Sequence, residues 1–372
     1  MFKGGQWPPL DGNISREMKK LDQLYATWRS LQPLDGRKQY LLSQRFTVDY
    51  NFNSNHMEGN TLTYGQTELL LLFGKVSGDG DLKDFNDMKA SQVSLKMMEE
   101  QAHLNSMPLT QNFIRTLHHT LLREDYQVYR TLPGGEQTSY TIHAGRYKTR
   151  PNSVITRYGD RFDYASPEET PALMTDLVDW YNEEEAKGNL TPVQLAALFH
   201  YRYIRIHPFE DGNGRIARLM VNYILARHNW PMVVVRNRNK SQYIDALHQS
   251  DVAIGPTPSD GAHATFQQIG AFARYFQKLV TTELEYDIDF VKEQSPNVWW
   301  YDGQKITFRS KSTPVILKAL KDNPDVTIES LSQLAGIATS AVKKQLRQMT
   351  EKGYIERRGE NGSWYVFAAP SV

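Results

Sequence analysis

One stretch of the sequence, residues 207–218, concentrates side chains whose types and spacing could do chemistry. It contains a histidine, an aspartate, two glycines and two arginines, namely His207, Asp211, Gly212, Gly214, Arg215 and Arg218. Glycines let the backbone turn sharply and leave its N–H groups open to a ligand. If these amides begin a helix, the helix dipole and the unpaired donors attract an anion. A base, a cation-binding carboxylate and an anion-binding loop together indicate nucleotide chemistry.

Two helices must position this stretch. Apolar residues recur at helical spacing from Leu195 to Ile206 before it and from Ile216 to Ile224 after it. Arg215 and Arg218 are three residues apart, so both point from the first turn of the second helix. Taken singly, each polar side chain could also be a turn former or part of a solvated helix face. We favour the functional interpretation because no packing rule requires all of them in one loop.

Composition limits the function classes. The 372 residues suffice for two or more domains, and 40% hydrophobic with 23% charged residues is typical of a soluble globular chain. The net charge of +1 gives no whole-chain signal for nucleic acid or an anionic membrane. The lack of cysteine excludes disulfides and cysteine metal sites. Residues 1–13 lack the apolar segment of a signal peptide and no run could span a bilayer, so we expect a cytoplasmic protein without membrane contact.

Periodicity predicts a mainly helical fold. Helices are expected over about residues 14–58, 64–73, 84–101, 110–123, 167–186, 191–206, 239–250 and 260–292, the last with a break. Glycine and proline interrupt residues 131–163, where extended pieces at 147–149 and 154–156 indicate a hairpin. Polar residues at 295–296 and 301–303 indicate a linker. After it, helices over 313–321, 327–334 and 340–352 and a hairpin over 354–367 are typical of a winged helix-turn-helix domain.

A second segment of interest, residues 54–59, ends the first helical region. Ser54 and Glu58 are four residues apart and share a helix face, while Gly59 suits the left-handed residue that ends a helix. The helix dipole disfavours a carboxylate at the C-terminal end. We therefore expect Glu58 to have a cationic partner.

The stretch 207–218 resembles the signature of the Fic family, H-x-F-x-[D/E]-G-N-G-R-x-x-R, at every specified position. The resemblance implies a Fic-type helical bundle with a β-hairpin flap, and transfer of AMP from ATP to a Ser, Thr or Tyr hydroxyl of a protein, the chain itself included. It implies that His207 takes the hydroxyl proton, that Asp211 holds Mg²⁺ and that pyrophosphate leaves. The nucleotide-binding residues that it implies are Asp211, Gly212, Asn213, Gly214, Arg215, Ile216, Ala217 and Arg218.

Ser54, Glu58 and Gly59 resemble the inhibitory motif of the same family, [S/T]-x-x-x-E-[G/N]. In the family this glutamate pairs with the second arginine of the signature, here Arg218, so that ATP is bound unproductively. The resemblance implies an autoinhibited enzyme in which Glu58 lies in the nucleotide site. The alternative is an ordinary surface glutamate at a helix end.

The resemblance also indicates contacts beyond the two motifs. The hairpin before the catalytic helices resembles the family's flap, which holds the target segment, and Val154 and Ile155 are the candidate contacts; the alternative is an ordinary surface hairpin. Tyr243 and Ile244 stand where the family places adenine-contacting residues, although Tyr243 could simply pack in the core. Asp251 falls where relatives often have asparagine, which puts its base contact in doubt.

The C-terminal region, residues 304–372, is more basic than the rest, with eleven Lys and Arg against six Asp and Glu. Lys343, Lys344 and Arg347 on its third helix and Arg357 and Arg358 on its wing could meet DNA phosphates or bases. The fold also serves protein–protein contacts, so both partners stay open. We expect residues 1–110 to form an N-terminal helical region with the inhibitory helix, 111–293 the Fic catalytic domain and 304–372 the winged-helix domain.

Other functions remain open beside AMP transfer. Some relatives with the inhibitory glutamate remove AMP, with that residue positioning a water, and Glu58 would then be catalytic. Relatives that move phosphate or phosphocholine lack parts of this pattern. A DNA-binding transcriptional regulator with ATP as a ligand is the alternative outside the enzymes. Relatives with the inhibitory helix often dimerise, so a homodimer is a further expectation.

Overall fold

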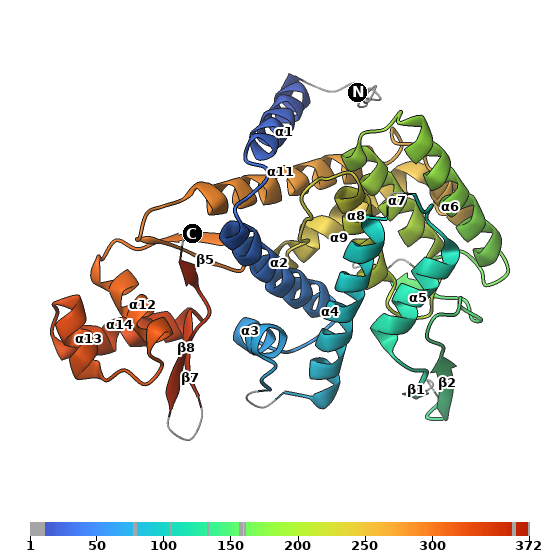
Figure 1. The fold of residues 1–372 in the computed structure, drawn as a ribbon. Helices are drawn as coiled ribbons and strands as arrows, with labels where there is room; N and C mark the ends of the chain where they lie inside the picture. The colour runs from blue at the N-terminus through green and yellow to red at the C-terminus, as the bar shows by residue number, and fades with distance from the viewer. Residues whose placement is uncertain are drawn as a thin grey trace. The chain divides into compact units, whose positions relative to one another are not determined.

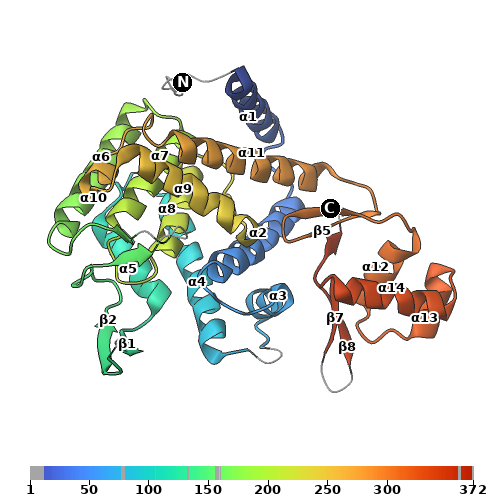
Figure 2. The ribbon, with the colours of Figure 1, turned by 180° about the vertical axis from the view of Figure 1, so that it is seen from behind.

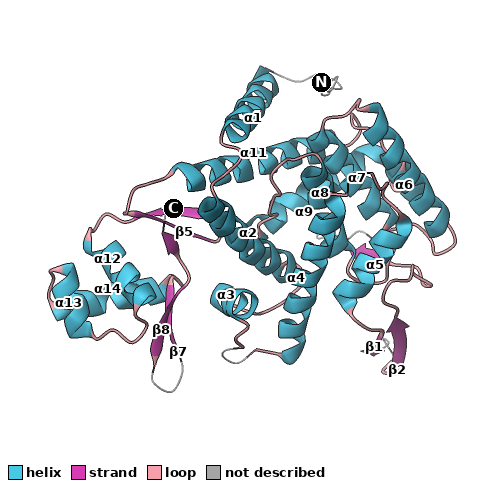
Figure 3. Cartoon of the chain, viewed as in Figure 1, coloured by secondary structure: helices cyan, strands magenta, loops and turns pink. Residues whose placement is uncertain are grey.

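The computed structural model of the chain describes residues 12–76, 80–104, 106–131, 134–155, 159, 161–358 and 362–370. Most of these residues are helical, as the cyan ribbon in Figure 3 shows, and the strands form small hairpins and one three-stranded sheet. The expected fold class is confirmed. None of the helices in this part of the chain is long and apolar enough to cross a membrane. Most of residues 1–13, on which the signal-peptide prediction rests, lie outside the described part.

The chain divides into two compact units, each made of three segments. The first unit comprises residues 1–21, 53–59 and 86–281, and the second comprises residues 22–52, 60–85 and 282–372. These units cut across the linear division expected from the sequence. The segment 53–59 belongs to the first unit, although the residues before and after it in the chain belong to the second.

Two central helices, α7 (Pro192–Ile206) and α8 (Asn213–Arg227), lie side by side in the first unit (Figure 1). Their facing side chains, among them Phe199, Tyr203 and Ile216, are fully buried. The first unit also contains α5 (Gln111–Leu122), α6 (Thr170–Lys187), α9 (Lys240–Ile254), α10 (Pro258–Ala262), most of α4 (Leu82–Ala102) and the first half of α11 (Gly270–Lys292). The expected break in the last long helix is confirmed between α10 and α11.

Local sequence sets the ends of α7 and α8. Thr191 and Gln194 form a capping box with Pro192 at the first position, which satisfies the free donors at the start of α7. That helix ends at His207, whose backbone is left-handed with φ 52°. The next helix begins after Gly212, which is left-handed with φ 77°. The two helix ends leave residues 207–212 as a short loop between them.

Two antiparallel hairpins precede α6. In the first, β1 (Tyr126–Thr131) pairs with β2 (Gln137–Ile142); it lies beside α5 in Figure 2. In the second, β3 (Ser153–Ile155) pairs with β4 (Arg161–Asp163), with Val154 opposite Phe162. The expected strand at 154–156 is found as β3, although residue 156 lies outside the described part. The expected strand at 147–149 is wrong because those residues contact the loop after α7 instead of a neighbouring strand.

The second unit contains the winged-helix domain. Its helices are α12 (Ser312–Asp322), α13 (Ile328–Ala335) and α14 (Thr339–Glu351), and its wing pairs β7 (Ile355–Arg358) with β8 (Ser363–Val366). Buried apolar side chains such as Leu317, Leu331 and Val342 join the three helices. The same unit holds α3 (Tyr64–Phe73), residues 22–30 of α1 (Gly12–Ser30) and residues 36–52 of α2 (Gly36–His56).

The linker expected around residues 295–303 is wrong. β5 (Val298–Tyr301) lies between β6 (Gln304–Thr307) and β9 (Ala369–Pro370) in a three-stranded sheet. Asp302 and Gly303 both have positive φ, 42° and 64°, and form the two-residue turn that favours an Asp-Gly pair. Asp302 and Gly303, expected as part of a linker, are therefore a hairpin turn, whereas residues 295–296 lie in irregular chain before β5.

Candidate active site

The loop after α7 lines a cavity of about 260 Å³ in the first unit. The cavity brings together most of the predicted site residues, namely His207, Asp211, Gly212, Asn213, Gly214, Arg218, Tyr243, Ile244 and Glu58. Tyr243 and Ile244 come from α9, and Glu58 comes from the turn after α2. Three segments far apart in the sequence therefore form one pocket.

His207 closes α7 and faces this pocket. Its N–H donates to the Tyr203 carbonyl at 2.9 Å, and the ring of Tyr164 stacks on its imidazole with centroids 3.9 Å apart. Burial, and then the nearby Lys148 ammonium, lower the pKa of His207 to about 3. The ring is therefore neutral near pH 7 and able to accept a proton. His207 is a weaker base than a free imidazole because burial disfavours its charged form.

Asp211 is held as a carboxylate at the mouth of the loop. Its Oδ2 accepts a hydrogen bond from the Tyr126 hydroxyl at 2.5 Å, and its Oδ1 accepts from the Gly212 N–H at 2.7 Å. Arg215 Nη2 lies 3.5 Å from Oδ2. Burial raises the pKa of Asp211, but Arg215 and these two donors outweigh it and lower the pKa below its usual value. The side chain is 44% exposed, so the ionised group can meet a ligand in the cavity.

The loop is fixed from its inner side by His118, Phe209 and Asn213. The imidazole of His118 stacks on the Phe209 ring at 3.7 Å, and its Nε2 lies 2.9 Å from the Asp211 carbonyl. Because His118 Nδ1 accepts from the Gly145 N–H, the neutral ring carries its proton on Nε2. The Asn213 side chain donates to the Phe209 carbonyl at 2.7 Å and accepts from its N–H at 2.9 Å. His118 is thus a core histidine.

Arg218 is paired with the segment 53–59. Its Nη2 donates to Glu58 Oε1 at 2.6 Å and to the Ser54 carbonyl at 2.9 Å, and its Nε donates to Ser54 Oγ at 3.0 Å. The Arg218 side chain is only 3% exposed. Burial raises the pKa of Glu58, but Arg218 outweighs it and lowers the pKa below its usual value. The cationic partner expected for Glu58 is therefore the second arginine of the 207–218 stretch.

Glycines at two positions permit this contact. A Cβ on Gly214 would lie 2.6 Å from Glu58 Oε1 and 3.0 Å from Arg218 Nη1, so only glycine leaves room for the pair as it stands. Gly59 follows with φ 95°, the left-handed conformation expected for it. Gly214 therefore permits the close approach of Glu58 to the start of α8, and Gly59 permits the left-handed backbone after Glu58.

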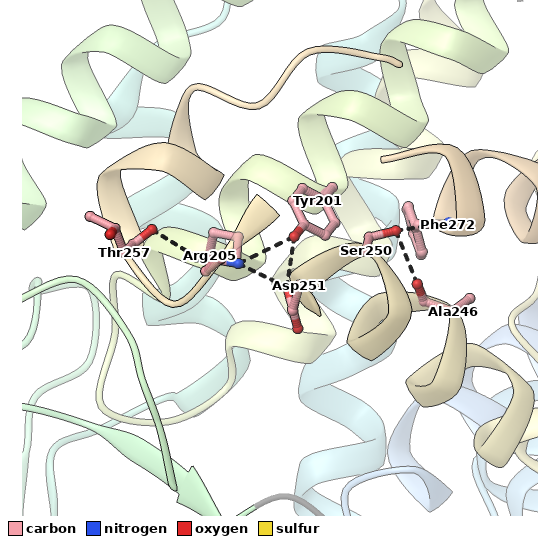
Figure 4. Close-up of polar contacts among 8 residues, drawn as sticks. Tyr201, Arg205, Ala246, Ser250, Asp251, Thr257 and Phe272 are labelled. Carbon is pink, nitrogen blue, oxygen red and sulfur yellow. Dashed lines mark hydrogen bonds and ion pairs between the residues drawn. The ribbon is translucent and has the colours of Figure 1, made fainter. Parts of the chain in front are cut away.

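Three of the residues predicted to bind the nucleotide, Arg215, Ile216 and Ala217, do not line this pocket. The side chains of Ile216 and Ala217 are fully buried in the core of α8 and do not line the cavity. Asp251 lies in a separate network, drawn in Figure 4, where it accepts hydrogen bonds from the Tyr201 hydroxyl at 2.7 Å and Arg205 Nη1 at 3.1 Å. Asp251 therefore has a structural role, because its carboxylate bonds Tyr201 and Arg205 and does not line the cavity.

The predicted flap residues lie on β3. Val154 is 43% exposed and Ile155 is 66% exposed, which is unusual for apolar side chains of their size. Among the described residues β3 pairs with β4 alone, so the other side of β3 has no strand beside it in this part of the chain. The geometry is compatible with strand addition by a peptide.

Sequence reasoning missed several residues of the site. Tyr126 bonds Asp211, Tyr164 covers His207, and Lys240 and Leu247 line the cavity from α9. Lys148 and Asn152 bond the backbone of the loop after α7. None of these residues belongs to a motif with fixed spacing, and only the position of Lys240 and Leu247 on the helix of Tyr243 gave a signal.

The basic residues of the winged helix differ in their surroundings. Lys343, Lys344 and Arg347 are exposed on α14. On the wing, Arg357 Nε donates to the Gly362 carbonyl and Arg358 Nη2 pairs with a neighbouring glutamate, each at 2.5 Å. The two wing arginines are thus engaged within the wing, and on α14 Arg347 Nε lies 3.6 Å from Glu351 Oε1. Lys343 and Lys344 are the exposed α14 cations with no ion pair among the described residues.

A helical unit whose pocket joins a histidine, a helix N-terminus and a buried arginine defines a class of proteins that bind anionic ligands such as nucleotides. Residues 108–225 match the model of the Fic/DOC family, and residues 310–356 match a winged helix-turn-helix DNA-binding family. A crystal structure of a Fic domain containing signaling protein from Bacteroides thetaiotaomicron is 52% identical, with a TM-score of 0.68 over 73% of this chain and 96% of that chain. The chain belongs to the Fic/DOC family.

More distant relatives agree with this assignment. The protein adenylyltransferase fic-1 of Caenorhabditis briggsae is 27% identical over 292 residues, which are 78% of this chain and 50% of that relative. The chain thus spans about half the length of this adenylyltransferase. A crystal structure of a Fic family protein from Desulfovibrio desulfuricans shares the fold over 97% of this chain and 98% of its own, at 18% identity and a TM-score of 0.54.

Proposed function

We propose that this chain is a protein adenylyltransferase, which transfers AMP from ATP to a protein hydroxyl, and that Glu58 holds it in a resting state. The observation that carries the proposal is one pocket that contains His207, the start of α8 and Arg218, with the Glu58 carboxylate on that arginine. Family membership and the adenylyltransferase relative support the reaction.

In the proposed reaction a hydroxyl oxygen of the target attacks the α-phosphorus of ATP, and the bond to pyrophosphate breaks. The neutral His207 takes the hydroxyl proton. Backbone amides at the N-terminus of α8 stabilise charge on the phosphate under attack, and Arg215 and Arg218 stabilise the leaving pyrophosphate. The target hydroxyl is that of a Ser, Thr or Tyr, on another protein or on this chain.

Asp211 fits the magnesium role that the family implies. It is ionised, partly exposed and adjacent to the amides proposed for the phosphates. No cluster of three His, Asp or Glu side chains occurs among the described residues, so Asp211 would share the ion with phosphate and water oxygens. When bound there, magnesium would neutralise phosphate charge.

The resting state is proposed from the contacts of Arg218. A guanidinium that donates to Glu58 and twice to Ser54 has fewer N–H groups left for a phosphate. The pair is charge-assisted and its arginine is buried, which makes the contact stronger than a surface ion pair. Release of Glu58 would free Arg218 for ATP.

The test is transfer of label from α-³²P-ATP with Mg²⁺ to protein. Weak label in the wild type, strong label in Glu58→Gly and none in Glu58→Gly with His207→Ala would support both halves of the proposal. Glu185→Gln is the matched control, because it breaks an Arg–carboxylate pair with Arg227 outside the pocket. If Glu58→Gly gains no label over the wild type, the resting state is wrong; if no variant labels any protein, the transfer is wrong.

Removal of AMP is a second candidate, favoured by the position of Glu58. Its carboxylate lines the same cavity as His207 and is 39% exposed, so a water on it could reach a bound phosphate. A protein labelled by Glu58→Gly would lose AMP when treated with the wild type and keep it when treated with Glu58→Ala. Equal loss with both would exclude Glu58 from removal.

DNA binding by the winged helix is a separate proposal, supported by the family match at 310–356 and the exposed cations of α14. Replacing Lys343 and Lys344 by alanine should weaken binding to a duplex and reduce its salt dependence. The control replaces Lys187 and Lys278, which lie in the first unit. Equal binding by both double variants would direct attention to a protein partner instead.

A further inference from the structure

The segment before the flap, residues 148–152, bonds four consecutive carbonyls at the end of α7. The Lys148 ammonium donates to the carbonyls of residues 206 and 207, at 3.0 and 2.9 Å. The N–H of Lys148 donates to the carbonyl of residue 208 at 2.9 Å. The Asn152 amide donates to the carbonyl of residue 209 at 3.0 Å, and its Oδ1 accepts from Lys148 at 2.9 Å. One short segment thus determines the path of the backbone through His207.

The backbone of His207 needs such support. A residue with a Cβ pays a conformational cost in the left-handed region, where His207 has φ 52° and ψ 60°. Contacts from the surrounding residues can offset this unfavourable conformational free energy. Lys148, which is only 3% exposed, supplies two of those contacts directly to the peptide groups on either side of the His207 Cα.

The far end of the flap meets the same histidine. Tyr164 directly follows β4, and its ring stacks on the His207 imidazole at an angle of 14°. The N–H of Tyr164 donates to the Asn152 carbonyl at 3.3 Å, so the two ends of the hairpin are joined to each other. The backbone of His207 is held from the start of the flap, and its side chain is covered from the end of the flap.

We infer that Lys148 and Asn152 are positioning residues that fix His207 relative to the flap. They bond the loop before α8 and set the position of the base relative to a hydroxyl carried by a segment along β3. Lys148 contacts only the His207 side of that loop, whereas Asn152 shares the Phe209 carbonyl with Asn213 of α8. This inference rests on the proposed transfer reaction and deepens it. It gives a role to the hydrogen bonds between residues 148–152 and the end of α7, where His207 lies.

The test uses the Glu58→Gly protein and whatever acceptor it labels, the chain itself included. Lys148→Met should lower kcat about tenfold to a hundredfold, because a small misplacement of a base is costly. The Kd for ATP, measured by calorimetry, should stay within about twofold, because the phosphate side is not altered. Asn152→Ala should give the same split between kcat and Kd. The fold reduction in kcat of the double variant should be smaller than the product of the two single reductions, because both residues act on one loop.

A second readout does not depend on transfer. In protein labelled with ¹³C at histidine Cε1, the His207 resonance, assigned from His207→Ala, should move or broaden in Lys148→Met. Lys187→Met is the control, because it removes an exposed lysine from α6 and should leave the resonance in place. The inference is overturned if both Lys148→Met and Asn152→Ala keep kcat and the resonance, or if they weaken ATP binding instead. If Glu58→Gly labels nothing while the resonance moves, the transfer proposal fails and the positioning of His207 stands.

Discussion

The Lys240 ammonium donates a hydrogen bond to the Met57 carbonyl at 2.5 Å. Lys240 is the first residue of α9, the helix that also carries Tyr243 and Ile244 into the cavity. One turn earlier, the N–H of Asn237 donates to the Asn53 side chain at 2.8 Å. The segment that carries Glu58 is therefore fixed to the helix of the proposed adenine contacts as well as to Arg218.

The contact of Lys240 leads to a first prediction. Lys240→Met should raise labelling by roughly twofold to fivefold when Glu58 is present, because an exposed charged contact is worth under about 1 kcal/mol. In the Glu58→Gly protein the same change should not raise labelling further, because the contact of Glu58 with Arg218 is already absent. Comparing initial rates of label transfer in the four proteins checks this. A fall in rate in Glu58→Gly with Lys240→Met would instead assign Lys240 to ATP binding.

The serine of the inhibitory segment gives a second prediction. Ser54→Ala removes the oxygen that accepts from Arg218 Nε, so a buried charged donor loses this hydrogen bond. Labelling should lie between wild type and Glu58→Gly, with a gain of roughly tenfold from the loss of a hydrogen bond to a charged group. Ser94→Ala is the control, because that buried serine of α4 donates only to the helix carbonyl of Ala90. Equal labelling by both variants would count against Ser54.

The pH dependence of transfer gives a third prediction. Because His207 has a pKa of about 3, its neutral, proton-accepting form persists as the pH falls through 6.5, the ordinary value for histidine. The charge of Glu58 raises the pKa of His207, so removing Glu58 lowers it further. The rate of labelling by Glu58→Gly should therefore show no acid limb near pH 6.5. A profile that drops by half at that pH would show that the ring titrates as if exposed.

The Tyr126–Asp211 hydrogen bond gives a fourth prediction. Tyr126→Phe removes a donor that fixes the orientation of the proposed magnesium ligand. The Mg²⁺ concentration for half-maximal labelling should rise roughly tenfold, as for other partners of metal ligands. Tyr129→Phe on the same strand is the control, because its hydroxyl bonds only Gln127 among the described contacts. An unchanged magnesium requirement in Tyr126→Phe would remove Asp211 or its partner from the ion site.

The predictions from the sequence agree with the structure where a motif or the regular spacing of apolar residues supported them. The helices around residues 207–212 follow from apolar spacing and a capping box, and the partnership of Glu58 follows from a carboxylate at a helix end. The Asp302-Gly303 turn was misjudged because polar composition is shared by linkers and hairpin turns. Composition alone does not separate them; the turn chemistry of an Asp-Gly pair does.

The residues that sequence reasoning missed share a physical reason. Lys148, Asn152 and Tyr164 lie in or beside irregular chain, where no repeat of apolar residues reports burial. Their roles arise from contacts with a loop more than forty positions away in the chain, such as Lys148 to the carbonyl of His207. Asp251 shows the converse case. An aspartate where relatives often have asparagine put a base contact in doubt, and in the structure Tyr201 and Arg205 bond its carboxylate.

The close packing at Gly214 limits which substitutions could release the proposed resting state. Its missing methyl group leaves room for Glu58 in the resting state, and the same space lies at the helix start proposed for phosphate. An added methyl would expel the carboxylate, yet it would also narrow the loop for ATP. A genetic selection for self-activating variants should therefore return changes at Ser54 and Glu58 and none at Gly214.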